Sequence, residues 1–391
     1  MSTGGLRSVT APVGQRPEDL VIEEVELADW LLEQLFVAYQ QARAGKRGTD
    51  DEHNFEINAV ENLIRLRDDI MLRQYKPSRG IAFISVEPVL REIFAAPFRD
   101  RVVHHFLFNM VAAWWDRHFI YDSYSCRRGK GTLFGIQRLA HHIQSVTENY
   151  AKPAYVIKTD FKGFFMSLDR KKLFERACWG LDRQFPAQND SLLYKLLKYL
   201  WGEIIFDDPT EGVERRGNLK LWDKLPPDKS LFCQPPGQGI VIGNLTSQLL
   251  SNVYLSPFDM FCKNELGFKH YGRYVDDAFY VVSEEEYPEA LRKIPVIREY
   301  ATGQGLMLHP KKLYVQSVYR GVPFLGARVY PGRIVPDRRI SANFMRAVEN
   351  YAWGRKPDMD RVLAYLGLLE HMKSGNLKKR VFEHVGWEYE F

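Results

Sequence analysis

Hydrophobic residues recur every three to four positions along three N-terminal stretches, 22–45, 54–75 and 98–115, which predicts helices that pack on one another. Between the second and third stretches, the β-branched and aromatic run at 81–86 predicts a strand. Residues 1–20 lack such a pattern and contain mostly small and polar residues, so we expect a flexible tail there.

The central part of the chain combines short apolar runs with polar segments. AYVIKTD, at 154–160, is typical of a strand that delivers Asp160 at its C-terminal end. Residues 171–203 have helical periodicity, and 248–266 predict a further helix. The segment 206–230 between them is polar and rich in turn residues, so we expect a surface insertion that tolerates substitution best.

The C-terminal part begins with two β-prone runs, YGRY and AFYVV, which flank the adjacent Asp276 and Asp277. Further strands are expected at 311–318 and 323–332. Helical patterns prevail from Ser341 onward, where the basic residues of KSGNLKKR stand close together. The mixture of strands and helices predicts an α+β fold.

The composition is that of a folded protein. Hydrophobic residues make up 45% of the chain, and no apolar run approaches the roughly 20 residues that a membrane span needs. The formal charge of +5 suits a polyanionic partner without requiring one. The cysteines stand far apart and form no CxxC pair, which argues against a zinc site or a disulfide framework and for reduced thiols in the cytoplasm. They are Cys126, Cys178, Cys233 and Cys262.

Three carboxylates are the main candidates for chemistry. Asp160 ends one predicted strand, and Asp276 and Asp277 lie between two β-prone runs, so one sheet could bring all three together. Such a cluster repels itself unless cations bridge it, and Mg²⁺ prefers hard oxygen ligands. The alternative is that Asp276 and Asp277 only form a hairpin turn, as aspartates often do. That alternative leaves Asp160 unexplained.

Two pairs of histidines are weaker candidates for metal ligands. His104 and His105 fall in one predicted helix, and His141 and His142 are also adjacent. Neighbouring residues on a helix point about 100° apart, so neither pair can easily chelate one ion. We expect ordinary histidines on helix faces.

Six sequence blocks follow one another along the central part of the chain. In chain order they are DSYSCRRGKGT, IKTDFKGFF, GIVIGNLTSQLLSNVYL, YVDD, GLMLHPKKLY and VPFLGARV. The second carries Asp160, and the fourth carries Asp276 and Asp277. In this order the blocks resemble those of reverse transcriptases, and the resemblance covers roughly residues 75–330. The resemblance implies a right-hand polymerase with fingers and N-terminal helices over 21–154, an antiparallel-sheet palm over 155–330 and a small helical thumb over 331–391.

Within this family, the chain is most similar to reverse transcriptases of diversity-generating retroelements, because it carries IGNLTSQ. Ile242 stands where related enzymes have a glutamine beside the incoming nucleotide, and Gly243 follows it. An aliphatic side chain there removes a polar contact, which implies relaxed fidelity, particularly opposite template adenines.

The resemblance also implies roles for individual residues. Asp160 and Asp276 would be the principal ligands of two Mg²⁺ ions, with the backbone carbonyl of Phe161 assisting and Asp277 completing the site. Lys312 would protonate or orient the leaving pyrophosphate, although the adjacent lysine at 311 competes for that role.

Further positions match contacts to substrates. Phe165 would exclude a 2′-hydroxyl and so select deoxynucleoside triphosphates, and Arg91 would touch the triphosphate. Phe165 could instead be a core aromatic, and we expect at least one of Phe161, Phe164 and Phe165 to be only that. Arg127, Arg128 and Lys130 suit the phosphates of template or primer, with a solvated loop as the alternative.

The resemblance implies a template RNA, a cDNA product and a small basic helical accessory protein that forms a pentameric ring. Two other interpretations stay open. One is a bacterial defence or retron-type reverse transcriptase, which shares the chemistry but uses another RNA. The other is a scaffold on a polymerase fold that binds RNA without catalysis.

Overall fold

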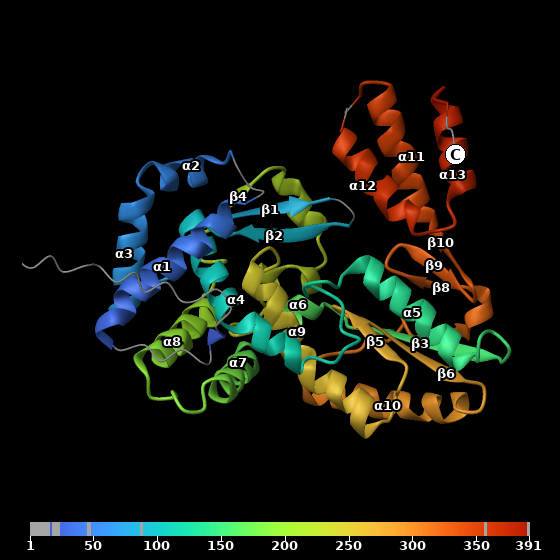
Figure 1. Cartoon of the computed structure of the whole chain (residues 1–391), viewed down its shortest axis with the longest axis horizontal. Helices are drawn as coiled ribbons and strands as arrows, with labels where there is room; N and C mark the ends of the chain where they lie inside the picture. The colour runs from blue at the N-terminus through green and yellow to red at the C-terminus, as the bar shows by residue number, and fades with distance from the viewer. Residues whose placement is uncertain (1–15, 18–23, 45–47, 87–88, 356–357, 389–391) are drawn as a thin grey trace, which may run out of the picture. The chain divides into compact units, whose positions relative to one another are not determined.

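The structure, a computed structural model, describes residues 16–17, 24–44, 48–86, 89–355 and 358–388 (Figure 1). The chain divides into two compact units, each made of two stretches. The first takes the described residues up to Phe119 together with Gly163–Ser256, and the second takes Ile120–Lys162 together with the chain from Pro257 onward. Both units cut across the ranges expected for fingers, palm and thumb, so those boundaries stay predictions. The predicted tail lies almost wholly outside the described residues.

The first unit is mainly helical. Its helices are α1 (Glu24–Arg43), α2 (Asp50–Ile57), α3 (Ala59–Met71), α4 (Phe98–His118), α6 (Phe164–Ser167), α7 (Arg170–Gln184) and α8 (Leu192–Phe206). α1 packs on α3 and α4, and α7 packs on α8. A small sheet of order β2-β1-β4 completes the unit, with β1 (Ile81–Ser85) antiparallel to β2 (Arg91–Ala95) and parallel to β4 (Glu214–Arg216).

Two predicted helices of this unit are interrupted in the structure. The stretch 54–75 divides at Asn58, the residue that ends α2 and begins α3. The stretch 171–203 divides between α7 and α8, where Pro186 has no amide hydrogen to donate. The side chain of Ser191 then accepts a hydrogen bond from the backbone of Tyr194 and caps α8.

The second unit contains two antiparallel sheets. The larger has the order β5-β6-β3-β7, and the smaller has the order β10-β9-β8. The strands of the larger sheet are β3 (Ala154–Asp160), β5 (Tyr271–Tyr274), β6 (Asp277–Ser283) and β7 (Tyr314–Ser317). Those of the smaller are β8 (Val322–Phe324), β9 (Ala327–Tyr330) and β10 (Arg333–Pro336). The predicted strand at 154–160 is confirmed, and 323–332 forms β8 and β9 around a turn.

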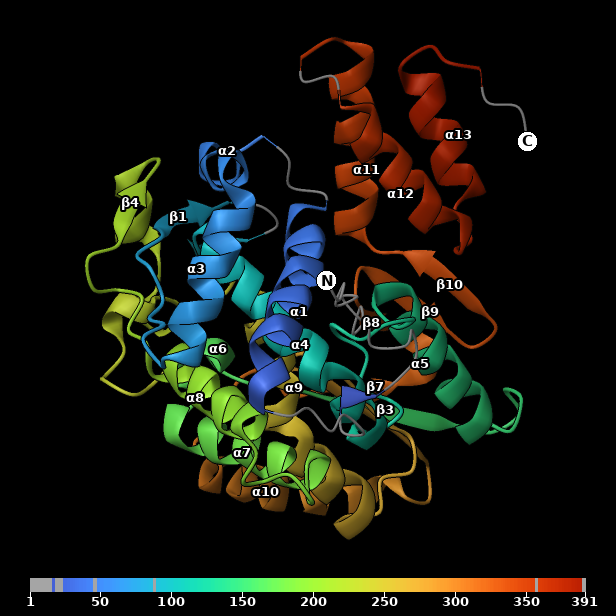
Figure 2. The same ribbon diagram turned by 60° about the vertical axis from the view of Figure 1, so that its left-hand side comes forward.

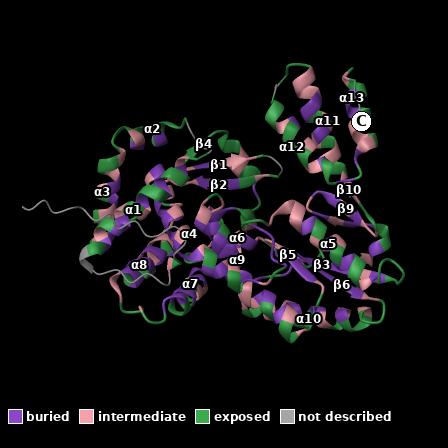
Figure 3. Cartoon of the chain, viewed as in Figure 1, coloured by how far each residue is buried: buried purple, intermediate pink, exposed green. Residues whose placement is uncertain are grey.

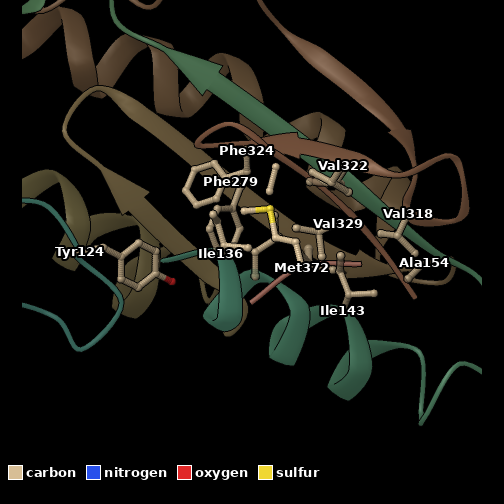
Figure 4. Close-up of a cluster of buried hydrophobic side chains, with 14 residues drawn as sticks. Tyr124, Ile136, Ile143, Ala154, Phe279, Val318, Val322, Phe324, Val329 and Met372 are labelled. Carbon is tan, nitrogen blue, oxygen red and sulfur yellow. The ribbon is translucent and has the colours of Figure 1, made fainter. Parts of the chain in front are cut away.

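Helix α5 (Thr132–Val146) covers both sheets of this unit, since it packs on β5, β6 and β9. Figure 4 shows Ile136 and Ile143 of this helix among the side chains of the sheets, including Phe279 and Val329. The central strands β3 and β6 are largely buried (Figure 3). α10 (Tyr287–Gly303) packs beside β6. The core therefore sits directly behind the strand ends that carry the aspartates.

Three helices end the described chain: α11 (Arg338–Ala352), α12 (Met359–Glu370) and α13 (Gly375–His384). They lie side by side (Figure 2) around buried side chains that include Phe344 and Leu369. The helical part begins at Arg338 rather than at 331, because β10 pairs with β9 first. Helix α9 (Leu245–Met260) crosses the boundary between the units and continues as a π-helical turn. No helix within the described ranges is long and apolar enough to cross a membrane.

Candidate active site

The register of two strands in the second unit places Asp160 and Asp277 opposite each other. Asp160 is the last residue of β3 and Asp277 is the first of β6, and the two are direct partners in the antiparallel ladder. Directly opposed residues point to the same face, with Cβ atoms roughly 4.5–5.5 Å apart. β5 and β6 form a hairpin, and Asp276 lies in its turn. The hairpin considered from the sequence is therefore present, and it opposes Asp277 to Asp160.

The hairpin turn is held by a buried arginine that sequence reasoning missed. Arg273 Nη1 donates to the carbonyl of Val275 at 2.8 Å, and the Val275 amide donates to Ser125 Oγ at 3.2 Å. Val275 itself has φ 53°, a left-handed conformation that a β-branched residue rarely adopts. These bonds on both sides fix the strained residue directly before Asp276.

Arg273 is in turn paired with Asp259. Its Nε and Nη2 atoms lie 2.7 and 2.6 Å from the two carboxylate oxygens, and both side chains are at most 1% exposed. Tyr271 donates a third bond to the same carboxylate at 2.6 Å. Removing either partner of such a buried pair is costly, because the other charge is then left buried and unpaired.

Two lysines neutralise the opposed aspartates. Lys312 Nζ lies 2.5 Å from Asp160 Oδ2, and Lys158 Nζ lies 3.0 Å from Asp277 Oδ2. The hydrogen bond that Lys312 donates to Asp160 raises the pKa of Lys312, and the charges of Asp276 and Asp277 raise it further. Burial raises the pKa of Asp277, and Lys158 opposes that effect. Lys312 therefore experiences the charges of all three carboxylates.

The loop before β7 pairs with the end of β3, and this pairing brings Lys312 next to Asp160. The His309 amide donates to the Asp160 carbonyl at 2.8 Å, and the Lys162 amide donates to Met307 at 2.8 Å. Phe161 pairs with Leu308 as an isolated bridge. The Phe161 ring is buried, so its side chain belongs to the core, and only its backbone is available for the predicted role.

The donor atoms suit a hard divalent cation, because carboxylate and carbonyl oxygens are the ligands that Mg²⁺ prefers. No three His, Cys, Asp or Glu side chains of the described chain lie close enough together to form a ready metal site. Asp160 and Asp277 instead each carry a lysine at hydrogen-bond distance. Metal binding by Asp160, Phe161, Asp276 and Asp277 thus stays a prediction, and Lys312 would have to move before a cation could bind Asp160 Oδ2.

Phe161, which was also predicted to contact the nucleotide, belongs to the second unit. The other four predicted nucleotide contacts belong to the first unit, where three of them lie near one another. Phe165 and Ile242 pack against one buried cluster that includes Phe94 of β2. The Phe94 amide donates to the Ile242 carbonyl at 3.2 Å, which ties this segment to the strand that begins with the exposed Arg91. Gly243 has φ 134°, and a Cβ there would stand 2.7 Å from the Phe94 carbonyl oxygen. Glycine is therefore needed at 243 for steric reasons alone.

The basic loop of the second unit lies beside the hairpin. The Tyr124 amide donates to the Arg273 carbonyl at 3.0 Å, so residues just before the loop run alongside β5. Arg127 donates to the carbonyls of Ile120 and Ser123 at 2.6 and 3.0 Å, and Lys130 donates to the Tyr121 carbonyl. These two cations therefore help to shape their own loop. Arg128 is exposed.

Both histidine pairs lie on helices, α4 and α5, as predicted. His104 is buried and bonded to Thr246 Oγ1 at 2.9 Å, and burial lowers its pKa to about 3. His142 is buried 3.3 Å from Asp122 Oδ2. Burial would raise the pKa of Asp122, but the bonds from His142 and Arg138 outweigh it and hold that pKa below its usual range. These histidines serve packing and hydrogen bonding.

The segment 206–230 differs from the expected tolerant insertion, because a buried glutamate anchors its second half. Glu92 of β2 is fully buried and accepts bonds from Trp222 Nε1 at 2.8 Å, Ser230 Oγ at 2.9 Å and the Leu231 amide at 2.7 Å. A turn-rich composition signals loops but gives no sign of a distant carboxylate that fixes them. The segment is therefore anchored to β2 at these positions, and its tolerance of substitution stays a prediction.

We expect Glu92→Gln to loosen this segment. Glutamine keeps the size of the side chain but replaces one acceptor oxygen by an NH₂ donor that faces other donors. We expect this to lower the free energy of unfolding by about 1–3 kcal/mol. Urea unfolding and limited proteolysis within 206–230 measure the effect. Glu211→Gln is the matched control, since that carboxylate is 74% exposed. Equal proteolysis of both variants would show that Glu92 does not anchor the segment.

Comparison with known proteins gives matches of structure but none of sequence. No family model matches the chain, and no curated protein matches it. The structure is similar to a telomerase from Candida tropicalis in complex with a TWJ fragment of telomeric RNA, with 10% identity, a TM-score of 0.48 and coverage of 80% of this chain and 56% of that one. It is also similar to apo telomerase from Candida tropicalis truncated from its C-terminal domain, with 13% identity, a TM-score of 0.46 and coverage of 66% and 55%. The chain spans just over half the length of these telomerase chains, and likeness at this level does not identify a family.

Proposed function

We propose that this protein is an RNA-directed DNA polymerase that makes cDNA from a template RNA. The observation that carries the proposal is the register of β3 and β6, which opposes Asp160 to Asp277 beside a hairpin turn that contains Asp276. The resemblance of IKTDFKGFF and YVDD to reverse transcriptase motifs supports the same assignment. A right-hand polymerase with fingers, palm and thumb is the architecture that we propose with it.

Each residue of the site has a defined part in this reaction. When bound, two Mg²⁺ ions would stabilise the attacking primer oxygen and the leaving oxygen. Asp160 and Asp276, with the Phe161 carbonyl, would hold these ions at the strand ends. Lys312 is 58% exposed, so its ammonium group can turn from Asp160 toward a departing pyrophosphate and give it a proton or a hydrogen bond.

Further residues would contact the substrates in this proposal. Arg91 would touch the triphosphate and Phe165 would exclude a 2′-hydroxyl, so that deoxynucleotides are selected. Ile242 and Gly243 would lie beside the nucleotide, and the loss of a polar contact at 242 would relax fidelity opposite template adenines. The basic loop at 127–130 would contact phosphates of template or primer.

The finer proposal is a mutagenic retroelement enzyme, which rests on IGNLTSQ at 242–248. It implies deoxynucleoside triphosphates as substrates, a cognate template RNA and a small basic accessory protein that forms a pentamer. A defence or retron-type enzyme would carry out the same reaction on another RNA. Fidelity distinguishes the two interpretations.

The test is cDNA synthesis on a primed RNA template with Mg²⁺, with and without the cognate RNA and accessory protein. We expect extension that the double variant Asp276→Asn, Asp277→Asn abolishes, with errors concentrated at template adenines. Aspartate-dependent but accurate cDNA would reject the mutagenic subclass and favour the defence class. No aspartate-dependent cDNA under any condition would reject the polymerase and favour an RNA-binding scaffold.

A further inference from the structure

The two lysines at the candidate site are held very differently. Lys312 lies on a loop before β7, and its side chain is 58% exposed at the bond to Asp160. Lys158 lies within β3, and its side chain is only 14% exposed at the bond to Asp277. An exposed lysine exchanges its partner for water at little cost, whereas a buried one does so only by leaving a charge unpaired.

Further contacts fix Lys158 on the core side of the sheet. Its ammonium group donates to the carbonyl of Pro323 in β8 at 2.9 Å and lies 5.3 Å from the centre of the Phe324 ring. Lys158 stands opposite Phe279 in β6, so Asp277 is its diagonal neighbour, two residues along that strand. The ammonium group of Lys158 therefore links its own strand β3 to the start of β6 and to β8.

We propose that Lys158 is a positioning residue that keeps Asp277 as a permanent ion-pair partner, so that Asp160 and Asp276 alone supply the carboxylates for a divalent cation. This inference rests on the proposed polymerase function, and it revises the role expected for Asp277 from the sequence. The two opposed carboxylates thus differ in their lysines, because a cation can replace the exposed Lys312 at Asp160 more easily than the buried Lys158 at Asp277.

The inference predicts that substitutions of Lys158 and of Asp277 change the affinity for a divalent cation in opposite directions. Lys158→Met removes a positive charge beside the acidic residues and should tighten binding of a divalent cation. Asp277→Asn leaves Lys158 unpaired and should weaken it. Changes near a metal typically alter affinity by roughly 10- to 100-fold. The double variant restores the charge balance, so its affinity should return to within about threefold of the unmodified protein.

The experiment is a Mn²⁺ titration of the full chain followed by electron paramagnetic resonance, without nucleotide. We expect Asp160→Asn and Asp276→Asn to abolish saturable binding, and the Lys158→Met, Asp277→Asn double variant to retain it. If the double variant binds as weakly as Asp277→Asn alone, Asp277 is a ligand and the inference is overturned, while the proposed function stands. If the unmodified protein shows no binding that depends on Asp160 and Asp276, both are overturned.

A second measurement tests the ion pair itself, without metal. In EDTA, Lys158→Met should lower the melting temperature by an amount on the order of 4 °C, and by clearly less in the Asp277→Asn background. Lys158→Arg keeps the positive charge and should lower the melting temperature by less than Lys158→Met does. Lys152→Met is the matched control, because that lysine is 58% exposed and bonded to Glu148 on the surface. Equal losses from Lys158→Met in both backgrounds would overturn the pairing.

Discussion

Asp160→Asn is expected to reduce Mg²⁺-dependent primer extension by roughly 10³-fold or more, because bound metal supplies several kcal/mol of transition-state stabilisation. Asparagine has the same shape and still accepts a hydrogen bond from Lys312, which lies 2.5 Å from the carboxylate. The substitution therefore removes charge while leaving the packing of β3 intact. Single-turnover extension of a primed RNA template, with protein in excess over primer, measures the chemical step.

The control for this prediction is Asp190→Asn, an exposed aspartate in the link between α7 and α8. It changes the net charge of the protein by the same amount, so nonspecific attraction to RNA changes equally in both variants. We expect the control to extend primers at the normal rate. An Asp160→Asn variant that stays within about tenfold of the control would show that this carboxylate does not bind a catalytic metal.

The strands that deliver the aspartates were predictable from sequence because their signals are local. AYVIKTD is a short apolar run with its polar residue at the end, and it forms β3 with the expected bounds. YGRY and AFYVV form β5 and β6, with the turn between them. Both β-propensity and turn chemistry act over a few residues, so one window of sequence contains them.

The partners of these aspartates were not predictable, because they come from elsewhere in the chain. Lys158 is close to Asp160 in sequence, and because side chains alternate along a strand, both lie on one face of β3. Only the register of β3 and β6 shows that Lys158 donates its hydrogen bond to Asp277. Arg273 did give a signal, since an arginine inside a β-prone run needs a buried partner. Nothing local identified that partner as Asp259 in α9.

The sequence also did not show which stretches of chain make up each of the two units. Each unit joins two separate stretches of chain, and hydrophobic patterns report local elements rather than which elements share a core. The buried Glu92 illustrates the same limit, because a turn-rich segment 130 residues later provides its donors. Long-range polar contacts thus account for the partners of Asp277 and Arg273 and for the anchored segment, none of which a local pattern indicates.

Arg273→Met is expected to destabilise the protein by roughly 3–5 kcal/mol, because it leaves the Asp259 carboxylate buried without its cation. Both side chains are at most 1% exposed, so solvent cannot replace the arginine without opening the structure. Val275 also loses the donor at its carbonyl, which loosens the turn that contains Asp276. Urea unfolding followed by circular dichroism gives the loss of stability, and primer extension below the unfolding transition reports the effect on the turn.

Two further variants make this result specific to the buried pair. Arg292→Met removes an arginine that is 75% exposed and bonded to Glu289 on the surface of α10, and we expect a loss within about 0.5 kcal/mol. Replacing both partners, with Arg273→Met and Asp259→Leu together, removes the unpaired charge and should recover much of the stability, because apolar residues often replace a buried ion pair without loss. Activity should not recover with it, since methionine cannot donate to the Val275 carbonyl. A double variant as unstable as Arg273→Met alone would mean that the arginine acts through its packing and not through its charge.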